Sequence, residues 1–474
     1  MSEGALWQAD EAAQATGGRA SGQWSATGVS IDSRSVEPGD LFVALRGPSR
    51  DGHAFVGSAL KQGAAAAMVT HLPAGLPSTV PHLLVDDTQS ALAALARRAR
   101  ARAERVGLVA VTGSVGKTST KEGLRLALER QGKTFGSPGN LNNHWGAPLS
   151  LSRLPADARF AVLELGMNHA GEIGPLSRLA RPYVAVVTTV EAVHLEFFES
   201  VQGIADAKAE LFEGLEDGGI AVLNRDNAFF DRLASAARTR GAGRVLGFGE
   251  HPQADVRLLS LTLFAATSHL TADVDGCCVS YKVGAPGRHM ALNSLAILAA
   301  VKALGADVGL AALALADLSA LKGRGRQCEV PVSGGGFTLL DESYNASPAS
   351  LRASLEVLGR VPIGPRGRRI AVLGDMLELG AAAPELHAEL AKQMLENGID
   401  LVFCCGANMA HLAAALPAER LARHAADATA LRPAVLASMR NGDAVMVKGS
   451  FGMGMASLVE ALLALRQPAE RLKA

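Results

Sequence analysis

The sequence predicts an α/β protein built from three domains, and three observations support this. The chain has 474 residues, more than one hydrophobic core usually holds at roughly 150 residues per domain. Continuous Val, Leu and Ile runs alternate with helical patterns from "GLVAVTG" onward, as in parallel sheets that are buried on both faces. Polar residues follow the ends of these runs, where open α/β sheets bind ligands. We place the domains at residues 1–100, 101–321 and 322–474.

The charge balance argues against a general affinity for polyanions. Lys plus Arg and Asp plus Glu number 46 each, so no net field draws the chain to nucleic acid or to an anionic membrane. The most apolar region, residues 290–321, is interrupted by Lys302, Asp307 and Asp317, which favours two buried helices over a membrane span. We therefore expect no nucleic-acid partner and no membrane insertion.

The N-terminus and the cysteines predict a cytoplasmic protein. The first residues, "MSEGALWQADEAAQATGG", lack the basic start and the apolar core of a signal peptide. The five cysteines show no C-x-x-C spacing, so they predict neither a zinc site nor a redox pair. An odd, unpatterned cysteine count fits a reducing compartment.

The first domain has a small, mixed α/β pattern. Strand-like runs flank the turn Pro38-Gly39-Asp40 in "GVSIDSRSVEPGDLFVALRG". An Ala-rich helix with several arginines, "SALAALARRARARAERV", then leads to the second domain and marks the boundary.

The second and third domains alternate strands with helices. In the second, the apolar runs "LVAVTG", "FAVLELG", "YVAVVTT" and "IAVLN" predict a parallel sheet, while residues 254–283 alternate like antiparallel strands and suggest an insertion. In the third, "GFTLLDESYN", "RRIAVLGDM", "DLVFCCG" and "DAVMVKGS" predict a Rossmann-like domain.

The stretch "VAVTGSVGKTSTKEG" predicts a phosphate-binding loop between a buried strand and a helix. Gly113 and Gly116 permit turns that direct backbone N–H groups toward one point, Lys117 adds a positive charge, and the Thr118 hydroxyl can ligate Mg²⁺. The strict pattern G-x-x-x-x-G-K-[ST] is not met, because Val111 occupies the position of its first Gly. If the loop binds phosphate, the second domain is a P-loop ATPase-like unit. The alternative interpretation is a Gly-rich turn with an exposed Lys that binds no phosphate.

Two further residues are predicted at the same sheet edge as Lys117. Glu164 lies near the end of the strand "FAVLELG", where a buried carboxylate is costly unless it is paired or bound to a metal ion. His194 follows the next strand at the equivalent position. A lone His is more often a packed or surface residue than a ligand, but three such residues on one edge indicate a site.

A lysine is also predicted on the apolar face of the helix "VQGIADAKAELFEGL". Lys208 lies four residues after Ile204 on the face that carries Leu211, Phe212 and Leu215. Its ammonium could extend to solvent or pair with an acid. Near Mg²⁺, a deprotonated Lys208 could instead react with carbon dioxide and give an anionic carbamate. Spacing alone favours the ammonium that extends to solvent or pairs with an acid, and the sequence does not settle the choice.

With these residues placed, the chain resembles the Mur ligases, the ATP-dependent amide-forming enzymes of peptidoglycan precursor synthesis. The resemblance covers nearly the whole chain in the family's order, in the segments "DSRSVEPGDLFVALRG", "DGHAFV", "TGSVGKTSTKE", "GNLNNHWGAPLSL", "ELGMNHAGEI", "VHLE", "AKAELFEGL", "GRHMALNSLA", "KGRGRQ", "DESYNASPAS", "GDMLELG" and "VKGS". It includes the shortened phosphate loop. Asp341-Glu342 stands where two aspartates are usual, and Met290 stands where Asn is commoner.

The resemblance implies ATP and Mg²⁺ as cofactors and assigns their contacts. Lys117 would hold the γ-phosphate, Thr118 and Glu164 would serve Mg²⁺, His194 would serve a second Mg²⁺, and Lys208 matches a carbamylated lysine. Lys117, Glu164, His194 and Lys208 form the implied catalytic set. The implied nucleotide contacts are Gly113, Ser114, Gly116, Lys117, Thr118 and Ser119 in the loop, Asn293 at the adenine, Arg324 at phosphate and Asp341 at the ribose.

The substrate contacts are implied in the same way. Ser33 and Arg34 would bind the uridine diphosphate end in the first domain, and Asn142 and Asn143 would line the path to the reaction centre. In the third domain, which selects the incoming amine, the candidates are Tyr344, Asn345, Lys448 and Ser450. Read without the resemblance, Asn293, Arg324, Asp341 and the two asparagines would be ordinary helix, loop and turn residues.

The resemblance implies a ligase with small-molecule substrates, which joins D-alanyl-D-alanine to UDP-N-acetylmuramoyl-tripeptide through an acyl phosphate. We expect the protein to be a monomer. Because Arg324 and Asp341 would reach the nucleotide from the third domain, we expect that domain to close on binding. The alternatives are a related ligase that adds the third residue or glutamate to folate, and a nucleotide-regulated binding protein without ligation.

Overall fold

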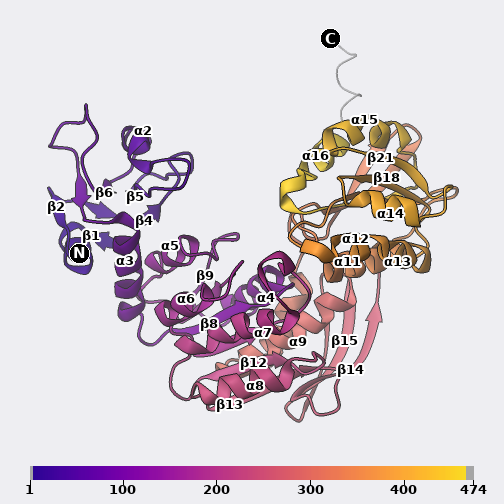
Figure 1. Cartoon of the computed structure of the whole chain (residues 1–474). Helices are drawn as coiled ribbons and strands as arrows, with labels where there is room; N and C mark the ends of the chain where they lie inside the picture. The colour runs from indigo at the N-terminus through magenta and orange to yellow at the C-terminus, as the bar shows by residue number, and fades with distance from the viewer. Residues whose placement is uncertain (1–3, 466–474) are drawn as a thin grey trace.

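The computed structural model describes residues 4–465, and its elements form three α/β units along the chain (Figure 1). The N-terminal unit has a five-stranded sheet and a two-stranded ribbon. The sheet order is β2 (Arg19–Ser21), β7 (His82–Leu84), β6 (Ala66–Val69), β5 (Asp40–Val43) and β4 (Gly28–Ser30); the ribbon pairs β1 (Trp7–Gln8) with β3 (Ser25–Ala26), and the helices are α1 (Ala9–Thr16) and α2 (Val56–Lys61). This unit is small and mixed, as the sequence predicts.

Helix α3 (Thr88–Arg102) connects the N-terminal unit to the central one (Figure 1). It begins where the Asp87 side chain accepts a hydrogen bond from the backbone N–H of Ser90 at 2.7 Å, a normal N-cap. Near its end, Arg100 is 1% exposed and donates to the Ala180 carbonyl at 2.8 Å. The boundary helix is therefore anchored in the central core.

The central sheet has nine strands within residues 4–465. Its order is β16 (Cys277–Val283), β15 (Ser268–Val274), β14 (Val256–Leu263), β13 (Arg244–Gly249), β12 (Ile220–Asn224), β11 (Val184–Val187), β8 (Gly107–Thr112), β10 (Phe160–Glu164) and β9 (Thr134–Gly136). Strands β8 to β13 pair in parallel, as predicted, and β14 to β16 are antiparallel to each other. The antiparallel strands within residues 254–283 extend the same sheet, because β14 pairs with β13.

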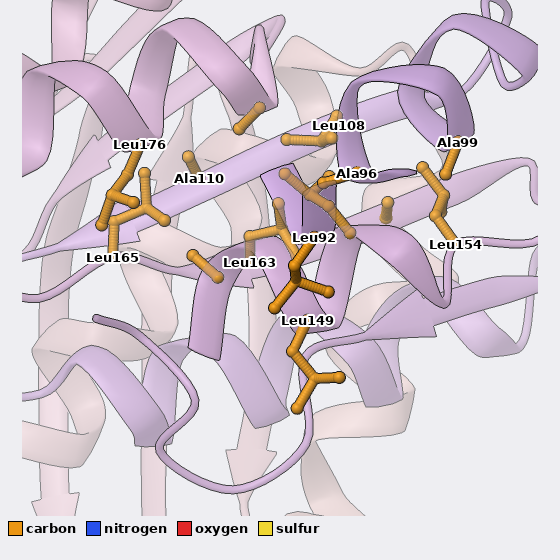
Figure 2. Close-up of a cluster of buried hydrophobic side chains, with 14 of the residues drawn as sticks. Leu92, Ala96, Ala99, Leu108, Ala110, Leu149, Leu154, Leu163, Leu165 and Leu176 are labelled. Carbon is orange, nitrogen blue, oxygen red and sulfur yellow. The ribbon is translucent and has the colours of Figure 1, made fainter. Parts of the chain in front are cut away.

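Helices cover both faces of the central sheet. Leu108 and Ala110 of β8 pack on one face against α3, α5 and α6, and Figure 2 shows part of this cluster. Val109 and Val111 pack on the opposite face against α4 and α9. This alternation explains the continuous apolar run of β8. The helices are α4 (Lys117–Glu129), α5 (Gly146–Ser152), α6 (Ile173–Ala180), α7 (Val201–Ala209), α8 (Phe230–Thr239), α9 (Arg288–Ala303) and α10 (Val308–Ala314).

The C-terminal unit has a six-stranded sheet, counted over the part of the chain that the structure describes. Its order is β17 (Arg326–Val332), β18 (Gly335–Glu342), β22 (Ala444–Lys448), β19 (Arg369–Gly374), β20 (Leu401–Cys405) and β21 (Leu421–Ala425), and β17 alone is antiparallel to its neighbour. Its helices are α11 (Pro348–Arg360), α12 (Ala383–Ala388), α13 (Leu390–Glu396), α14 (Met409–Ala415), α15 (Ala428–Ser438) and α16 (Ala456–Ala464). The pattern is Rossmann-like, as predicted.

Short 3₁₀ helices complete several loops. They are η1 (Gly52–Phe55), η2 (Leu195–Phe197), η3 (Glu210–Gly214), η4 (Leu315–Asp317), η5 (Gly380–Ala382) and η6 (Phe451–Met453). Segment η3 continues α7, so the predicted helix around Lys208 changes to 3₁₀ geometry after Ala209. No helix between residues 4 and 465 is long and apolar enough to cross a membrane, and the apolar region 290–321 holds α9 and α10.

Candidate active site

The phosphate loop lies between β8 and α4, and its two glycines are required by their surroundings. Gly113 has φ of 148°, and a Cβ there would lie 1.9 Å from Thr188 Oγ1. Gly116 has φ of 85° at the N-cap of α4, and a Cβ there would lie 2.8 Å from the Asn293 amide. The loop is therefore tightly packed against two neighbouring elements, and Asn293 of α9 lies beside it.

Lys117 is the first residue of α4 and points its ammonium back over the loop. Nζ donates to the Gly113 carbonyl at 2.7 Å. Burial lowers the pKa of Lys117, the Glu164 carboxylate opposes this, and the nearby Arg324 lowers the pKa further. Arg324 lines the same cavity as Lys117, so a cation of the C-terminal unit lies near the loop.

Glu164 ends β10 and is 2% exposed. Oε2 accepts a hydrogen bond from Thr118 Oγ1 at 2.8 Å, and Oε1 accepts one from Asn142 Nδ2 at 2.7 Å. In β8, Val111 lies opposite Glu164 in register, which brings this carboxylate to the beginning of the phosphate loop. The predicted grouping of Thr118 with Glu164 is thus present.

The positive charge of Lys117 lowers the pKa values of two further residues, His194 and Lys208. Burial lowers the pKa of His194, the Glu378 carboxylate opposes this, and Lys117 and Lys208 lower it further. Lys208 is 2% exposed, and burial, followed by repulsion from Lys117, holds its pKa well below the usual range. Lys208 therefore does not extend to solvent, and the charge that acts on its pKa is that of another lysine, Lys117.

A cavity of about 940 Å³ between the central and C-terminal units collects most of the predicted residues. Its walls include Ser114, Gly116, Lys117, Ser119, Asn142, Glu164, His194, Asn293, Arg324, Tyr344, Asn345, Lys448 and Ser450. Gly113, Thr118 and Lys208 do not line it. Gly113 accepts a hydrogen bond from the lining residue Lys117, and Thr118 donates one to the lining residue Glu164.

The C-terminal wall of the cavity is a connected set of polar and aromatic groups. The Arg324 guanidinium lies 3.7 Å from the centre of the Tyr344 ring, a cation–π contact. Lys448 Nζ lies 3.3 Å from Glu342 Oε2 and donates to the Asn345 carbonyl at 3.1 Å. These contacts hold the residues that follow β18 and β22 at one edge of the sheet, as the strand ends predict.

Two predicted ligand contacts, Asn143 and Asp341, form local hydrogen bonds in this structure, and their contacts with ligands stay predictions. Asn143 does not line the cavity, because its Oδ1 accepts from the backbone N–H groups of Trp145 and Gly146 at 3.1 and 2.9 Å and so holds the start of α5. Asp341 is 3% exposed, and its carboxylate accepts from Gly323 N at 2.8 Å and Ser343 Oγ at 2.6 Å. In this structure both side chains accept hydrogen bonds from nearby backbone or hydroxyl groups.

Ser33 and Arg34 lie in the N-terminal unit, apart from the cavity. The Arg34 side chain is 82% exposed and pairs with Asp32 at 2.6 Å. Hydrogen bonds from Arg34 lower the pKa of Asp32 to about 2. This segment presents an exposed ion pair on the surface of the first unit.

Sequence reasoning missed many residues of the cavity wall, and four polar ones among them are Asn140, His289, Glu342 and Glu378. Asn140 Nδ2 donates to the Tyr344 hydroxyl at 2.7 Å, and His194 Nδ1 lies 2.5 Å from Glu378 Oε2. Both contacts join the central unit to the C-terminal one. All four lie in sequence motifs that the family resemblance includes. The motifs could have indicated that these segments lie near the site, but they do not indicate which side chains face the cavity.

Three family models match the chain in order. They describe a Mur ligase family catalytic domain at residues 25–100, a Mur ligase middle domain at 111–301 and a Mur ligase glutamate ligase domain at 325–451. Each match falls within one of the three units described above.

Individual relatives agree with these models over almost the full length. The chain is 37% identical to the UDP-N-acetylmuramoyl-tripeptide--D-alanyl-D-alanine ligase of Escherichia coli (strain K12), covering 92% of this chain and 93% of the relative. A crystal structure of MurF from Acinetobacter baumannii is similar with a TM-score of 0.83 and 28% identity, covering 97% of this chain and 99% of that one. MurF ligase from Thermotoga maritima in complex with ADP gives a TM-score of 0.75 and 28% identity, covering 93% and 97%. The chain therefore belongs to the Mur ligase family.

Proposed function

We propose that this protein is an ATP-dependent ligase that joins D-alanyl-D-alanine to UDP-N-acetylmuramoyl-tripeptide in peptidoglycan precursor synthesis. The observation that carries the proposal is the cavity, in which a phosphate loop faces a polar wall from a second domain. The printed activity of the Escherichia coli relative supports the substrates, and the ADP complex of the Thermotoga maritima protein supports the nucleotide.

The nucleotide would lie along the loop and α9. The N-terminus of α4 offers unpaired backbone N–H groups to phosphate, and Lys117 adds a positive charge beside them. Asn293, packed against Gly116, would contact the base, and Arg324 would reach the phosphates from the C-terminal unit. The contact of Asp341 with the ribose stays a prediction. It requires the Asp341 carboxylate to give up its hydrogen bonds with Gly323 and Ser343 and to accept from the ribose.

The residues around Glu164 fit a magnesium ion. The Thr118 hydroxyl and the Glu164 carboxylate are 2.8 Å apart and supply the oxygen ligands that Mg²⁺ prefers. Lys208 fits only after carbamylation, which its lowered pKa favours, because the neutral amine is the form that attacks carbon dioxide. Within residues 4–465 no cluster of three His, Cys, Asp or Glu side chains forms a metal site, as expected for a set with one carboxylate and one imidazole. When bound, the ion would offset phosphate charge.

The reaction needs an activated carboxylate, because carboxylates react poorly with amines. The terminal carboxylate of the UDP-linked tripeptide would attack the γ-phosphorus, giving an acyl phosphate and ADP. Lys117 and Arg324 would stabilise the charge that develops on the transferred group. The amine of D-alanyl-D-alanine would then attack the acyl carbon, and phosphate would leave. Tyr344, Asn345, Lys448 and Ser450 on the opposite wall are the proposed contacts of the incoming amine and peptide.

The UDP end would bind in the N-terminal unit, with Ser33 and Arg34 as its proposed contacts. The Arg34 guanidinium is exposed and forms an ion pair with Asp32, so it is accessible to a diphosphate. The monomeric state and the cytoplasmic location stay predictions. All five cysteines are free thiols, which is compatible with that location.

The test is phosphate release from Mg²⁺-ATP with the two acceptors supplied singly and together, with the product identified by mass. Pentapeptide formation and phosphate release only when both are present would support the proposal. Turnover with glutamate or diaminopimelate instead would indicate a related ligase of the family. Nucleotide binding without turnover by any acceptor would contradict ligation and favour a binding protein.

A further inference from the structure

The C-terminal unit touches the wall of the phosphate site through a carboxylate that the mechanism above does not use. Glu378 lies in "GDMLELG", between β19 and η5, and its Oε2 is 2.5 Å from Nδ1 of His194. The Glu378 carbonyl also accepts from the backbone N–H of Glu196 at 3.1 Å. One residue therefore makes both a side-chain and a backbone contact with the loop after β11.

The backbone on both sides of this contact has an unusual conformation. His194 has φ of 56° and Glu378 has φ of 63°, in the left-handed region that residues other than Gly rarely adopt. Gly380, with φ of 55°, lies against the Glu196 backbone, where an added Cβ would be 3.4 Å from Glu196 Cα. Such conformations persist only where the surroundings hold them, and they gather at functional sites. The two turns thus bring these two side chains together.

The chemistry of the pair fixes the proton on the imidazole. An ionised carboxylate can only accept a hydrogen bond, so Nδ1 of His194 carries the hydrogen and donates it to Glu378. In the neutral ring, Nε2 then keeps its lone pair. Carboxylates that hold imidazoles in this way set both the tautomer and the ring orientation of metal-binding histidines.

We propose that Glu378 is a positioning residue, which fixes the orientation and tautomer of His194 across the domain interface. The nucleotide site on the central unit is then complete only when the C-terminal unit is seated against it. The proposal rests on the proposed function, in which this cavity takes Mg²⁺-nucleotide. It explains why a carboxylate that is remote from β8 and β10 approaches the same cavity.

The first test compares Glu378→Leu and Glu378→Gln with the wild-type protein in binding Mg²⁺-ADP and metal-free ADP by calorimetry. We expect Glu378→Leu to weaken Mg²⁺-ADP binding about 10- to 100-fold, the range for such supporting partners, and to leave metal-free ADP binding unchanged. Glu378→Gln keeps a neutral acceptor and should lose less. The matched control is Glu385→Gln, which removes an exposed carboxylate from α12 of the same unit. Equal losses with and without metal would overturn the proposal.

The second test asks whether Glu378 acts through His194. In a double-mutant cycle, Glu378→Leu should cause no further loss once His194→Ala is present, whereas independent, additive losses would contradict the proposal. Nitrogen-15 NMR of the His194 ring gives a readout that does not depend on turnover. Protonation at Nδ1 in the wild type, lost in Glu378→Leu, is the expected result; protonation at Nε2 in the wild type would overturn it. If the wild type forms no pentapeptide, the proposed function fails, and the ring spectrum still decides the role of Glu378.

Discussion

At the scale of single residues, buried charges in this protein serve two different purposes. Lys117 and Lys208 lie near the same cavity and repel each other, which burial makes more costly. Arg100 is 1% exposed, and carbonyl groups and one carboxylate surround it. A buried cation without a matching anion indicates a ligand site, whereas a fully hydrogen-bonded one indicates a structural tie.

Replacing Lys117 should impair catalysis far more than folding. In Lys117→Met the cavity loses the charge placed at the phosphates, so kcat should fall about 10²- to 10³-fold, as for the loss of one preorganised donor. The free energy of unfolding should change by about 1 kcal/mol or less, because the lost bond to the Gly113 carbonyl is offset by one less desolvated cation. Coupled phosphate release and urea unfolding measure the two effects. The control is Lys133→Met, whose exposed ammonium pairs with Asp157; a similar kcat loss there would contradict the assignment.

Replacing Arg100 should have the opposite outcome. Its guanidinium donates to the carbonyls of Ala180, Arg181 and Ala103 and lies 2.7 Å from Glu216. Arg100→Met leaves these acceptors unpaired, and we expect a loss of about 3–5 kcal/mol in the free energy of unfolding.

The matched control for Arg100 is Arg98→Met on the same helix. Arg98 is 48% exposed and pairs with Glu11, so it should cost less than about 1 kcal/mol. Urea unfolding monitored by circular dichroism makes the comparison. Equal losses in the two variants would show that α3 is not anchored through Arg100.

At the scale of elements, helix α12 holds the loop that carries Glu378 through a hydrogen bond between His387 and Met376. His387 is fully buried; its Nε2 accepts from Met376 N at 3.0 Å, and its Nδ1 lies 2.6 Å from the Ala383 carbonyl. This pattern requires the neutral ring with the hydrogen on Nδ1. The segment between β19 and η5 therefore depends on a histidine that stays uncharged.

His387 should make stability depend on pH. Burial lowers the pKa of His387 in the folded state below the usual value of about 6.5. Below that pH the unfolded chain therefore binds a proton at this histidine more readily than the folded chain does. The stabilisation from His387 is therefore complete above about pH 6.5 and is lost as the pH falls through and below that value. The free energy of unfolding should decline from pH 7.5 to 5.5.

The control variant for this pH effect is His387→Leu. It should be less stable at pH 7.5, since the Met376 N–H loses its acceptor, but it should show a shallower decline toward pH 5.5. Urea unfolding at several pH values gives the slopes. An unchanged slope in the variant would contradict a neutral buried His387.

At the scale of the whole molecule, the N-terminal and C-terminal units stand at opposite ends of the central one (Figure 1). The C-terminal unit already contacts the central cavity, through the bond from Asn140 to Tyr344 and the pair of His194 with Glu378. The proposed UDP contacts in the first unit do not line that cavity. A substrate that spans both sites must therefore bring these units into a defined arrangement.

We expect ligands to compact the molecule. Mg²⁺-ADP together with UDP-N-acetylmuramoyl-tripeptide should reduce the radius of gyration in small-angle scattering, because one substrate would bridge two domains and the closed site would exclude water from the acyl phosphate. Mg²⁺-ADP alone should cause a smaller change. An unchanged radius with both ligands bound at saturation would contradict domain closure.

The sequence predicted the local features of the fold because each depends on neighbouring residues. The apolar runs of β8 and β10 indicated buried parallel strands, and Gly113 and Gly116 marked the phosphate loop. The structure bears out these elements and the burial of Lys208. The antiparallel strands predicted within 254–283 are also present, and the structure adds that they join the central sheet through the pairing of β14 with β13.

By itself, the sequence determined which chemistry the chain carries: a phosphate loop, a buried acid at a strand end, and the family that contains them. These follow from periodicity and motif spacing, which act over a few residues. Tertiary structure alone decided which side chains meet. Asp341 turns inward to Gly323 N, and Glu378 reaches His194 across 184 positions of sequence. Such contacts depend on how separate domains pack and where each turn points its side chain, and no local pattern encodes either.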